Sequence, residues 1–258
     1  PAFYYIASEG SLTSPDQYLK FLADAGIPHR EVPIDDRVQG CSLAVQSWEA
    51  VYDSERLAMV LAARLRHAGV EVRLGAAVCD LRRAPHKSHF ANGTDYVIDF
   101  STEAKSQFWT CNAVVNCAYT DQNRLTAMLG IDPPTRLFEY TVVPIIAIPG
   151  LARQAITIMD GPFCSIQPYG FTDNFLLYHA KYAVVDSAVS KFCPTVWSEQ
   201  SFRDGFDAQF SFEPMRADAV RFIPVLANAR MVGLLHGPRM VLAGVDATDA
   251  RPSMVEQP

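Results

Sequence analysis

Several signatures that would point to a chemistry are missing from this 258-residue sequence. Its 14 glycines include no pair at positions i and i+2, which excludes the GxGxxG loop that holds a dinucleotide. No glycine precedes a lysine, so a Walker A loop is excluded as well. GxSxG and HExxH are also absent. The chain therefore lacks the short motifs typical of dinucleotide binding, nucleotide hydrolysis, serine hydrolysis and zinc proteolysis.

Clustered positive charge is missing too. The chain has 22 basic and 28 acidic residues, for a net charge of −6, and its lysines and arginines are dispersed. A nucleic-acid surface needs basic residues grouped against phosphates. We therefore expect no nucleic-acid partner.

Long apolar runs are absent. No run reaches the roughly 18 residues of a membrane-spanning helix. The most apolar stretch, Tyr140 to Met159, is interrupted by Pro144, Pro149 and Arg153. The start of the chain lacks the basic residues and the uninterrupted apolar stretch of a secretory signal. We predict no membrane-spanning segment and a cytoplasmic location.

Metal-binding patterns are also absent. The six cysteines form no CxxC pair, which argues against structural zinc and a thioredoxin-like site, and they predict small buried thiols in a reducing cytoplasm. They are Cys41, Cys79, Cys111, Cys117, Cys164 and Cys193. His86 and His89 flank Lys87 in a polar segment, which favours a solvated hairpin over a metal pair. We predict no metal site.

The ends of the sequence suggest a piece of a longer chain. Pro1 comes directly before an apolar, strand-like run without an initiator methionine. No closing element is evident before Pro258.

The first part of the chain predicts helices alternating with strands. Phe3–Ile6 is an expected strand, and the helix after it begins at the N-cap Ser14 and ends at Gly26. Turn-rich chain is expected from there to about Ser47. The next helix is capped by Asp53 or Ser54 and closed by Gly69. Its apolar residues recur at helical spacing: Leu57, Val60, Leu61, Leu65 and Ala68.

A small meander is expected next. Its predicted strands are Val70–Leu74, Ala77–Arg82, Tyr96–Phe100 and Phe108–Cys117, with a hairpin turn at Asn92-Gly93.

Downstream of residue 138 the hydrophobic period changes to two. The predicted strands there are Phe138–Ile148, Ala155–Met159, Phe163–Pro168 and Phe175–Tyr182. Helices are expected at Trp197–Phe210 and Pro214–Leu226, and final strands at Arg230–Leu235 and Met240–Ala243. The fold class is therefore α/β (or α+β): a mixed or antiparallel sheet packed with helices, beside a smaller α/β part.

Aromatic residues with polar tips mark one candidate pocket wall. Two predicted strands joined by a glycine-bounded turn carry Tyr169, Tyr178 and His179. Such side chains suit a wall that holds a small molecule. The alternative is ordinary aromatic packing on a sheet face.

Charged residues near strands form a second group of candidates. Glu139 interrupts an apolar strand, so it is a candidate acid or base, or else a structural hydrogen-bonding residue. The segment from Arg221 to Arg230 leads to Arg239, which follows an expected tight turn at Gly237-Pro238. An arginine at a rigid strand start can clamp a carboxylate through two hydrogen bonds, with a surface salt bridge as the alternative. Arg251 is expected to be a salt-bridge or turn residue.

The order of these motifs resembles the D-amino-acid oxidase and glycine oxidase family of FAD-dependent oxidoreductases. The resemblance rests on the helix-to-strand step at 68–72, on Val78 and on Val114–Tyr119. The family's Val-Val-Asn-Ala-Ala-Gly stretch has Cys117 in place of the first alanine and Tyr119 in place of the glycine. The run from Arg221 to Arg239 resembles the family segment that leads to a substrate-binding arginine loop.

The resemblance implies an FAD-dependent oxidoreductase that oxidises the C–N bond of a small-molecule amine or amino acid by hydride transfer, with no general base required. It implies that residues 1–137 are the edge of an FAD-binding domain with the start of a substrate domain. Residues 138–258 would be the substrate (cap) domain and the return toward the FAD domain. The implied FAD-binding residues are Val78, Cys117 and Ala118, and the implied substrate-binding residues are Tyr169, Tyr178, His179 and Arg239.

Two features of the family are not in this chain: the opening GxGxxG loop and the closing FAD-contacting segment. A rival hypothesis is therefore a module that binds a ligand or a protein and no nucleotide. Neither reading predicts a particular oligomeric state.

Overall fold

The computed structural model describes residues 1–84, 95–102, 105–205 and 208–243. The expected hairpin at Asn92-Gly93, the pair His86 and His89, and Arg251 lie outside these residues. The chain divides into two compact units of three segments each. The larger unit contains 1–60, 139–187 and 196–237, and the smaller unit contains 61–138, 188–195 and the end of the chain.

A nine-stranded sheet dominates the larger unit and runs in the order β11-β7-β10-β9-β8-β1-β3-β2, with β12 also paired to β7, among the described residues. The strands are β1 (Ala2–Ala7), β2 (His29–Glu31), β3 (Cys41–Ser47), β7 (Arg136–Ala147), β8 (Ala155–Met159), β9 (Cys164–Pro168), β10 (Asn174–His179), β11 (Val184–Ser190) and β12 (Arg230–Leu242). β1 is parallel to β8 and antiparallel to β3, so the sheet is mixed, as predicted.

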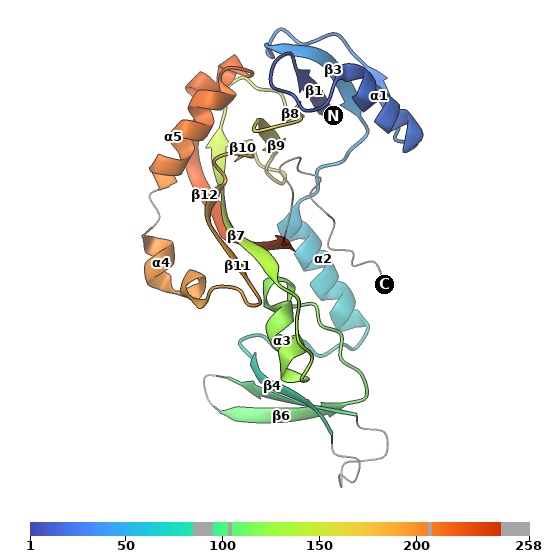
Figure 1. Cartoon of the computed structure of the whole chain (residues 1–258), viewed down its shortest axis with the longest axis vertical. Coiled ribbons are helices and arrows are strands. Elements are labelled where there is room, and N and C mark those ends of the chain that lie inside the picture. Colours follow the sequence, from blue (N-terminus) through green and yellow to red (C-terminus); the bar gives the residue numbers. More distant parts are fainter. Residues whose placement is uncertain (85–94, 103–104, 206–207, 244–258) are drawn as a thin grey trace. The chain divides into compact units, whose positions relative to one another are not determined.

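One face of this sheet forms the main core under helix α5 (Ala208–Ala219) (Figure 1). Ile156, Ile166 and Leu177 on the strands and Met215 on the helix are each fully buried. Burying such a side chain contributes about 1.5–3 kcal/mol. Strict alternation of buried and half-buried residues along β7 confirms the period of two predicted for this region.

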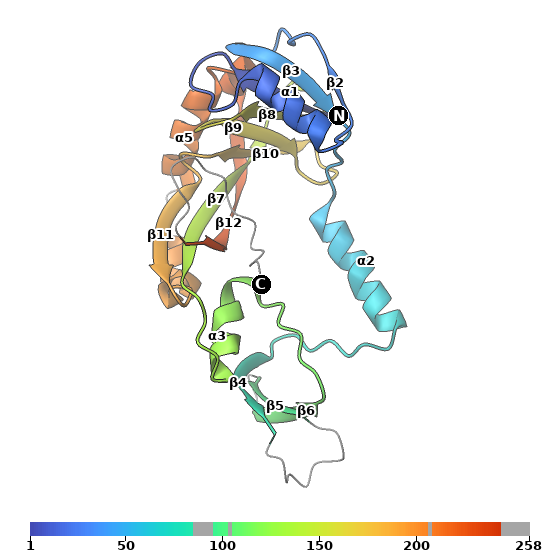
Figure 2. The same ribbon diagram turned by 45° about the vertical axis from the view of Figure 1, so that its right-hand side comes forward.

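The opposite face is partly covered by helix α1 (Pro15–Asp24), which lies along β1 and β3 (Figure 2). This helix begins as predicted. The Ser14 hydroxyl accepts a hydrogen bond from the Gln17 N–H, the Gln17 amide accepts one from the Ser14 N–H, and Pro15 occupies the first turn. Tyr18 and Leu22 are buried against the sheet.

The region expected to be turn-rich contains two strands, β2 and β3. Leu43, Ala44 and Val45 are buried, and β3 pairs with β1 from Ala2 to Ala7. Three consecutive residues of β3 are buried, so its sequence does not alternate with the period of two that marked the other strands. Pairing with β1 decides its conformation.

The helices of the C-terminal part are divided differently from the prediction. Thr195–Ser198 and Pro224–Asn228 form 3-10 turns (η2 and η3), and Gln200–Asp204 forms the short helix α4. Pro214, expected to start a helix, lies inside α5. A proline there removes one helix hydrogen bond and costs about 3 kcal/mol. Burial of the helix's apolar side against β9 and β10 offsets that cost.

The predicted turn at Gly237-Pro238 is wrong, because β12 continues through it. The Thr141 hydroxyl on β7 donates a hydrogen bond to the Gly237 carbonyl at 3.1 Å. β12 pairs with β7, and an edge strand tolerates a proline, which has no N–H to donate.

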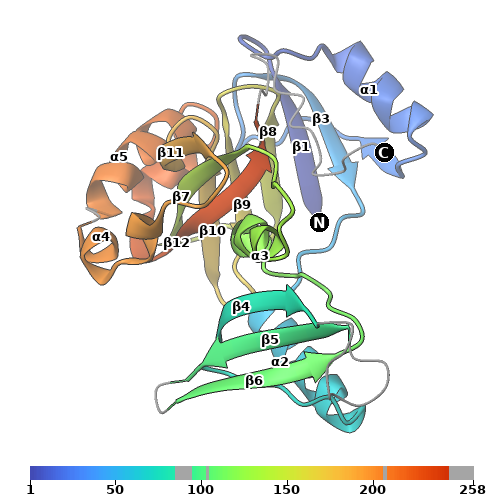
Figure 3. The ribbon, with the colours of Figure 1, turned by 60° about the horizontal axis from the view of Figure 1, so that its bottom comes forward.

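The smaller unit contains the antiparallel sheet β4-β5-β6, formed by β4 (Ala77–Arg83), β5 (Tyr96–Ser101) and β6 (Ser106–Cys111) (Figure 3). It also contains the 3-10 turn η1 (Tyr119–Asp121) and helix α3 (Gln122–Met128), which was not predicted. Helix α2 (Ser54–His67) begins in the larger unit and ends in the smaller one. The mixed α/β fold class is confirmed.

The predicted strand Val70–Leu74 does not form, and the strand predicted at Phe108–Cys117 ends at Cys111 as β6. Neither Val70–Leu74 nor residues 113–117 pair with a strand among the described residues. Their apolar side chains are exposed, with Leu74 at 88% and Val115 at 84%. Helix α2 likewise buries none of its residues within the described part of the chain. An apolar pattern alone does not make 70–74 or 113–117 a strand, because no neighbouring strand supplies their backbone hydrogen bonds.

No described helix is both long and apolar enough to cross a membrane.

Candidate functional site

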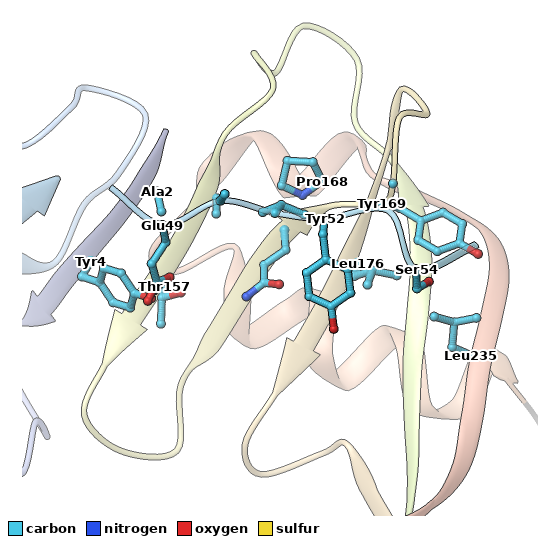
Figure 4. Close-up of a pocket in the computed structure, with 15 residues that line it drawn as sticks. Ala2, Tyr4, Glu49, Tyr52, Ser54, Thr157, Pro168, Tyr169, Leu176 and Leu235 are labelled. Atoms are coloured by element: carbon cyan, nitrogen blue, oxygen red, sulfur yellow. Dashed lines mark hydrogen bonds between the residues drawn. The ribbon is translucent and has the colours of Figure 1, made fainter. Parts of the chain in front are cut away.

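A pocket of about 300 Å³ lies on the larger unit (Figure 4). Strands β1, β8, β9, β10 and β12 contribute its floor. Tyr169 and Gly170, from the turn after β9, and the segment 49–54 contribute the rest. The lining residues are Ala2, Tyr4, Glu49, Ala50, Val51, Tyr52, Ser54, Ala155, Thr157, Gln167, Pro168, Tyr169, Gly170, Leu176 and Leu235.

Strand register explains why these side chains gather. Tyr4 on β1 is paired with Thr157 on β8, and Gln167 on β9 is paired with Leu176 on β10. Paired residues point to the same face of a sheet. The alternate residues, such as Leu177, point into the core under α5. The pocket therefore occupies the face opposite the core.

The covering segment is fastened by Asp53. One of its carboxylate oxygens accepts the N–H of Arg56 at 2.9 Å and so caps helix α2, while the other accepts the N–H of Phe171 at 3.2 Å. The Arg56 hydrogen bond lowers the pKa of Asp53. Gly170 makes this approach possible: its φ is +51°, and a Cβ there would lie 2.7 Å from Asp53 Oδ2. Glycine is the residue that tolerates both conditions.

The turn after Tyr169 is held by two arginines. The guanidinium groups of Arg56 and Arg153 lie 5.5 and 5.6 Å from the ring centroid of Phe171. Arg153 also donates hydrogen bonds to the carbonyls of Gly170 and Thr172. Cation–π contacts of this kind contribute about 0.5–1 kcal/mol each at exposed sites. The covering segment and the turn beneath it therefore form one connected wall.

The pocket has a charged end and an apolar end. In Figure 4, Tyr4 and Glu49 lie at one end, Tyr169 and Leu235 lie at the other, and Tyr52 lies between them. The Tyr4 hydroxyl donates a hydrogen bond to Glu49. The pKa of Tyr4 is raised, mainly by burial and also by this hydrogen bond. Glu49 is the one acidic residue among the described residues that line the pocket.

Of the predicted pocket residues, Tyr169 lines this pocket and Tyr178 does not. Tyr178 is half-buried and packs beside the core. The residues of the charged end, Tyr4 and Glu49, were not predicted. Tyr4 and Glu49 are far apart in the sequence, and the pairing of β1 with β3, which places Ser47 opposite Ala2, brings them together.

His179 is placed in the core, which corrects its expected place in the pocket wall. Strand alternation turns its ring to the face opposite Leu176, and it is fully buried. Its Nε2 lies 2.9 Å from Asp218 on α5, and its Nδ1 accepts the N–H of Lys181 at 3.2 Å. Burial lowers the pKa of His179, although Asp218 opposes that effect. A neutral ring that donates from Nε2 satisfies both contacts.

The charged candidates have separate positions. Glu139 is half-buried on β7, on the face opposite Phe138 and Tyr140. The side chain of Arg221 is 67% exposed and forms a salt bridge with Asp218 at 2.8 Å. Arg221 is thus a surface salt-bridge residue. Arg239 is half-buried within β12 and belongs to the smaller unit.

The candidate FAD-binding residues all lie in the smaller unit. Asn116 orders their segment: its side chain accepts the Ala118 N–H at 3.2 Å and donates to the Gln122 carbonyl at 2.9 Å. Cys117 is exposed and Ala118 is half-buried. Tyr119 has φ +49°, the left-handed conformation that favours glycine.

Arg124 connects this segment to Val78. Its guanidinium forms an ion pair with Asp121, which raises the pKa of Arg124, and donates to the Val78 carbonyl at 3.1 Å. Arg124 therefore joins Val78 and Asp121 in one hydrogen-bonded cluster.

The cysteines differ from expectation in their burial. All six thiols are free. Cys164 is buried, and burial raises its pKa to about 12, whereas Cys79 and Cys117 are exposed. The described residues hold no group of three or more His, Cys, Asp or Glu side chains placed to bind a metal ion.

Comparison with known proteins gives a likeness of fold. No family model and no curated protein matches the sequence. The structure is similar to glycine oxidase from Geobacillus kaustophilus (TM-score 0.62, 15% identity, 94% of this chain and 59% of that chain). It is also similar to L-proline dehydrogenase from P. horikoshii (TM-score 0.65, 11% identity, 95% of this chain and 61% of that chain).

A third similar structure is FAD-bound L-α-glycerophosphate oxidase from Mycoplasma pneumoniae (TM-score 0.61, 13% identity, 94% of this chain and 62% of that chain). The chain thus spans about three fifths of each of these three proteins. The fold expected from the motif order is confirmed.

Proposed function

We propose that this chain is part of an FAD-dependent oxidoreductase that oxidises the C–N bond of an amine or amino acid in the pocket of the larger unit. The observation that carries the proposal is the pocket on the open face of a sheet whose fold is similar to glycine oxidase and L-proline dehydrogenase. Pockets with an apolar lining and a few polar groups are typical substrate sites.

The residues of the smaller unit fit a contact with FAD. Cys117 and Ala118 have small side chains, and the left-handed Tyr119 ends the exposed loop that contains them. Small residues leave the backbone open to a flat ligand. Val78, which Arg124 joins to the same cluster, would contribute an apolar contact. The phosphate-binding loop that the family uses is not among the residues of this chain.

Bound FAD would supply the hydride acceptor for oxidation of the carbon next to the substrate nitrogen. The chain's own residues would orient that carbon. Tyr169, Leu176 and Leu235 offer apolar surface, and the segment held by Asp53 covers one side of the pocket. No catalytic base is assigned, because a neutral amine can pass the hydride directly.

Arg239 does not line this pocket. As a separate proposal, we assign it the binding of the carboxylate of amino-acid substrates. Arg239→Leu in the complete gene product should raise KM for an amino acid at least about 30-fold, or about 2 kcal/mol, and leave the flavin content unchanged. An unaltered KM, or lost flavin with intact substrate binding, would place the anion site elsewhere.

The test of the proposed function is the flavin itself. We expect the purified gene product that contains this chain to be yellow, with a flavin absorbance spectrum that bleaches when an amine or amino-acid substrate is added without oxygen. A folded, colourless protein that binds no FAD would overturn the proposal and favour a binding module.

A further inference from the structure

The charge distribution of the pocket points to the chemistry of its ligand. Among the described residues that line the pocket, Glu49 is the one acid, and none is a lysine or an arginine. An anionic group at that end would face an uncompensated carboxylate, whereas a cation would be attracted to it. The Tyr4 hydroxyl donates to Glu49 and so orients the carboxylate.

The opposite end offers a different surface. Leu176 and Leu235 are apolar, and Tyr169 adds an aromatic ring (Figure 4). The register of β9 against β10 fixes Leu176 beside Gln167. The volume of about 300 Å³ is at the lower limit of drug-sized sites. It suits one small molecule with a polar head and an apolar body.

We infer that Glu49 is the specificity-determining residue that binds the protonated amino group of the substrate, with the apolar body of the substrate on Tyr169, Leu176 and Leu235. This inference rests on the proposed function and narrows its substrate class to amines with an apolar side chain. Because Glu49 is exposed, the proton that the ammonium group releases before hydride transfer has a path to water.

Glu49→Gln is the decisive variant, because it removes the charge and keeps an oxygen that can accept from Tyr4. Glu31→Gln is the matched control, since Glu31 is an exposed acid on β2 that does not line the pocket. Both variants are made in the complete gene product. Calorimetry measures the binding of phenethylamine and of hydrocinnamate, a similar molecule with a carboxylate in place of the amine.

We expect Glu49→Gln to weaken phenethylamine binding about fivefold to tenfold and to tighten hydrocinnamate binding, while Glu31→Gln changes neither. Equal binding of phenethylamine to wild type and Glu49→Gln would overturn the inference. Tighter binding of hydrocinnamate than of phenethylamine to the wild type would overturn it as well.

The flavin content, measured separately by absorbance, distinguishes the two levels of the argument. A colourless protein whose amine binding depends on Glu49 would contradict the proposed function alone. A yellow protein whose amine binding ignores Glu49 would contradict this inference alone.

Discussion

The two faces of the nine-stranded sheet use neighbouring residues of one strand for different purposes. On β10, Leu177 and His179 point into the core under α5, whereas Leu176, in the same strand, lines the pocket. The polar residue on the core face is tightly paired: His179 contacts Asp218 and the Lys181 backbone. On the pocket face, Glu49 lies at the surface where a ligand can reach it. One face packs the core that stabilises the unit, and the other lines the pocket.

The largest expected difference between the faces concerns stability. Leu177→Ala should lower the free energy of unfolding by about 2–5 kcal/mol, because it leaves a cavity in a fully packed core. Leu176→Ala should lower it by less than about 1 kcal/mol, because its side chain borders an open pocket. Urea unfolding of the complete gene product measures both. Equal losses would mean that the pocket face is as tightly packed as the core.

The second prediction concerns the wall of the pocket. Gly170→Ala would place a Cβ 2.7 Å from Asp53 Oδ2 at φ +51°, so we expect a loss of about 1–2 kcal/mol and weaker phenethylamine binding. Gly150→Ala is the matched control, because Gly150 also has a positive φ, +78°, with nothing within 4 Å of its Cβ position. The control should show the conformational cost without the loss of binding. Equal binding by the two variants would show that the Asp53 contact does not shape the pocket.

The smallest effect concerns the pH dependence of the core face. The pKa of His179 is lowered in the folded protein, so the unfolded chain takes up this proton first as the pH falls through about 6.5. The contribution of His179 is therefore complete above that pH and declines below it, by at most about 1.4 kcal/mol at about pH 5.5. His179→Gln should flatten the change in urea midpoint between about pH 7.5 and about pH 5.5. An unchanged slope would assign the pH dependence to other groups.

Tyr119 has a backbone conformation that its residue type does not favour. A tyrosine where the resembling family has glycine would ordinarily argue for a different backbone, yet its φ is +49°. Asn116 and the following turn hold the backbone in place. Non-glycine residues pay about 1–2 kcal/mol for this conformation, which neighbouring hydrogen bonds offset.

The sequence by itself determined the features that depend on neighbours along the chain. Ser14, Pro15 and Gln17 predicted the start of α1, because capping uses residues within one turn. Alternation predicted β7, because a strand with one buried face has a period of two. The order of the Val78 and 113–118 motifs predicted the fold, since short motifs survive where overall identity does not.

Only the tertiary structure decided the features that depend on distant partners. β3 became a strand by pairing with β1, and β12 passed through Pro238 because β7 supplies its neighbour on one side. An alternating pattern does not show which face of a strand is buried. The packing of α5 and the contact with Asp218 place His179 on the core face. The pocket joins Tyr4 and Glu49 to Leu235, and contacts over such separations arise only when the sheet is assembled.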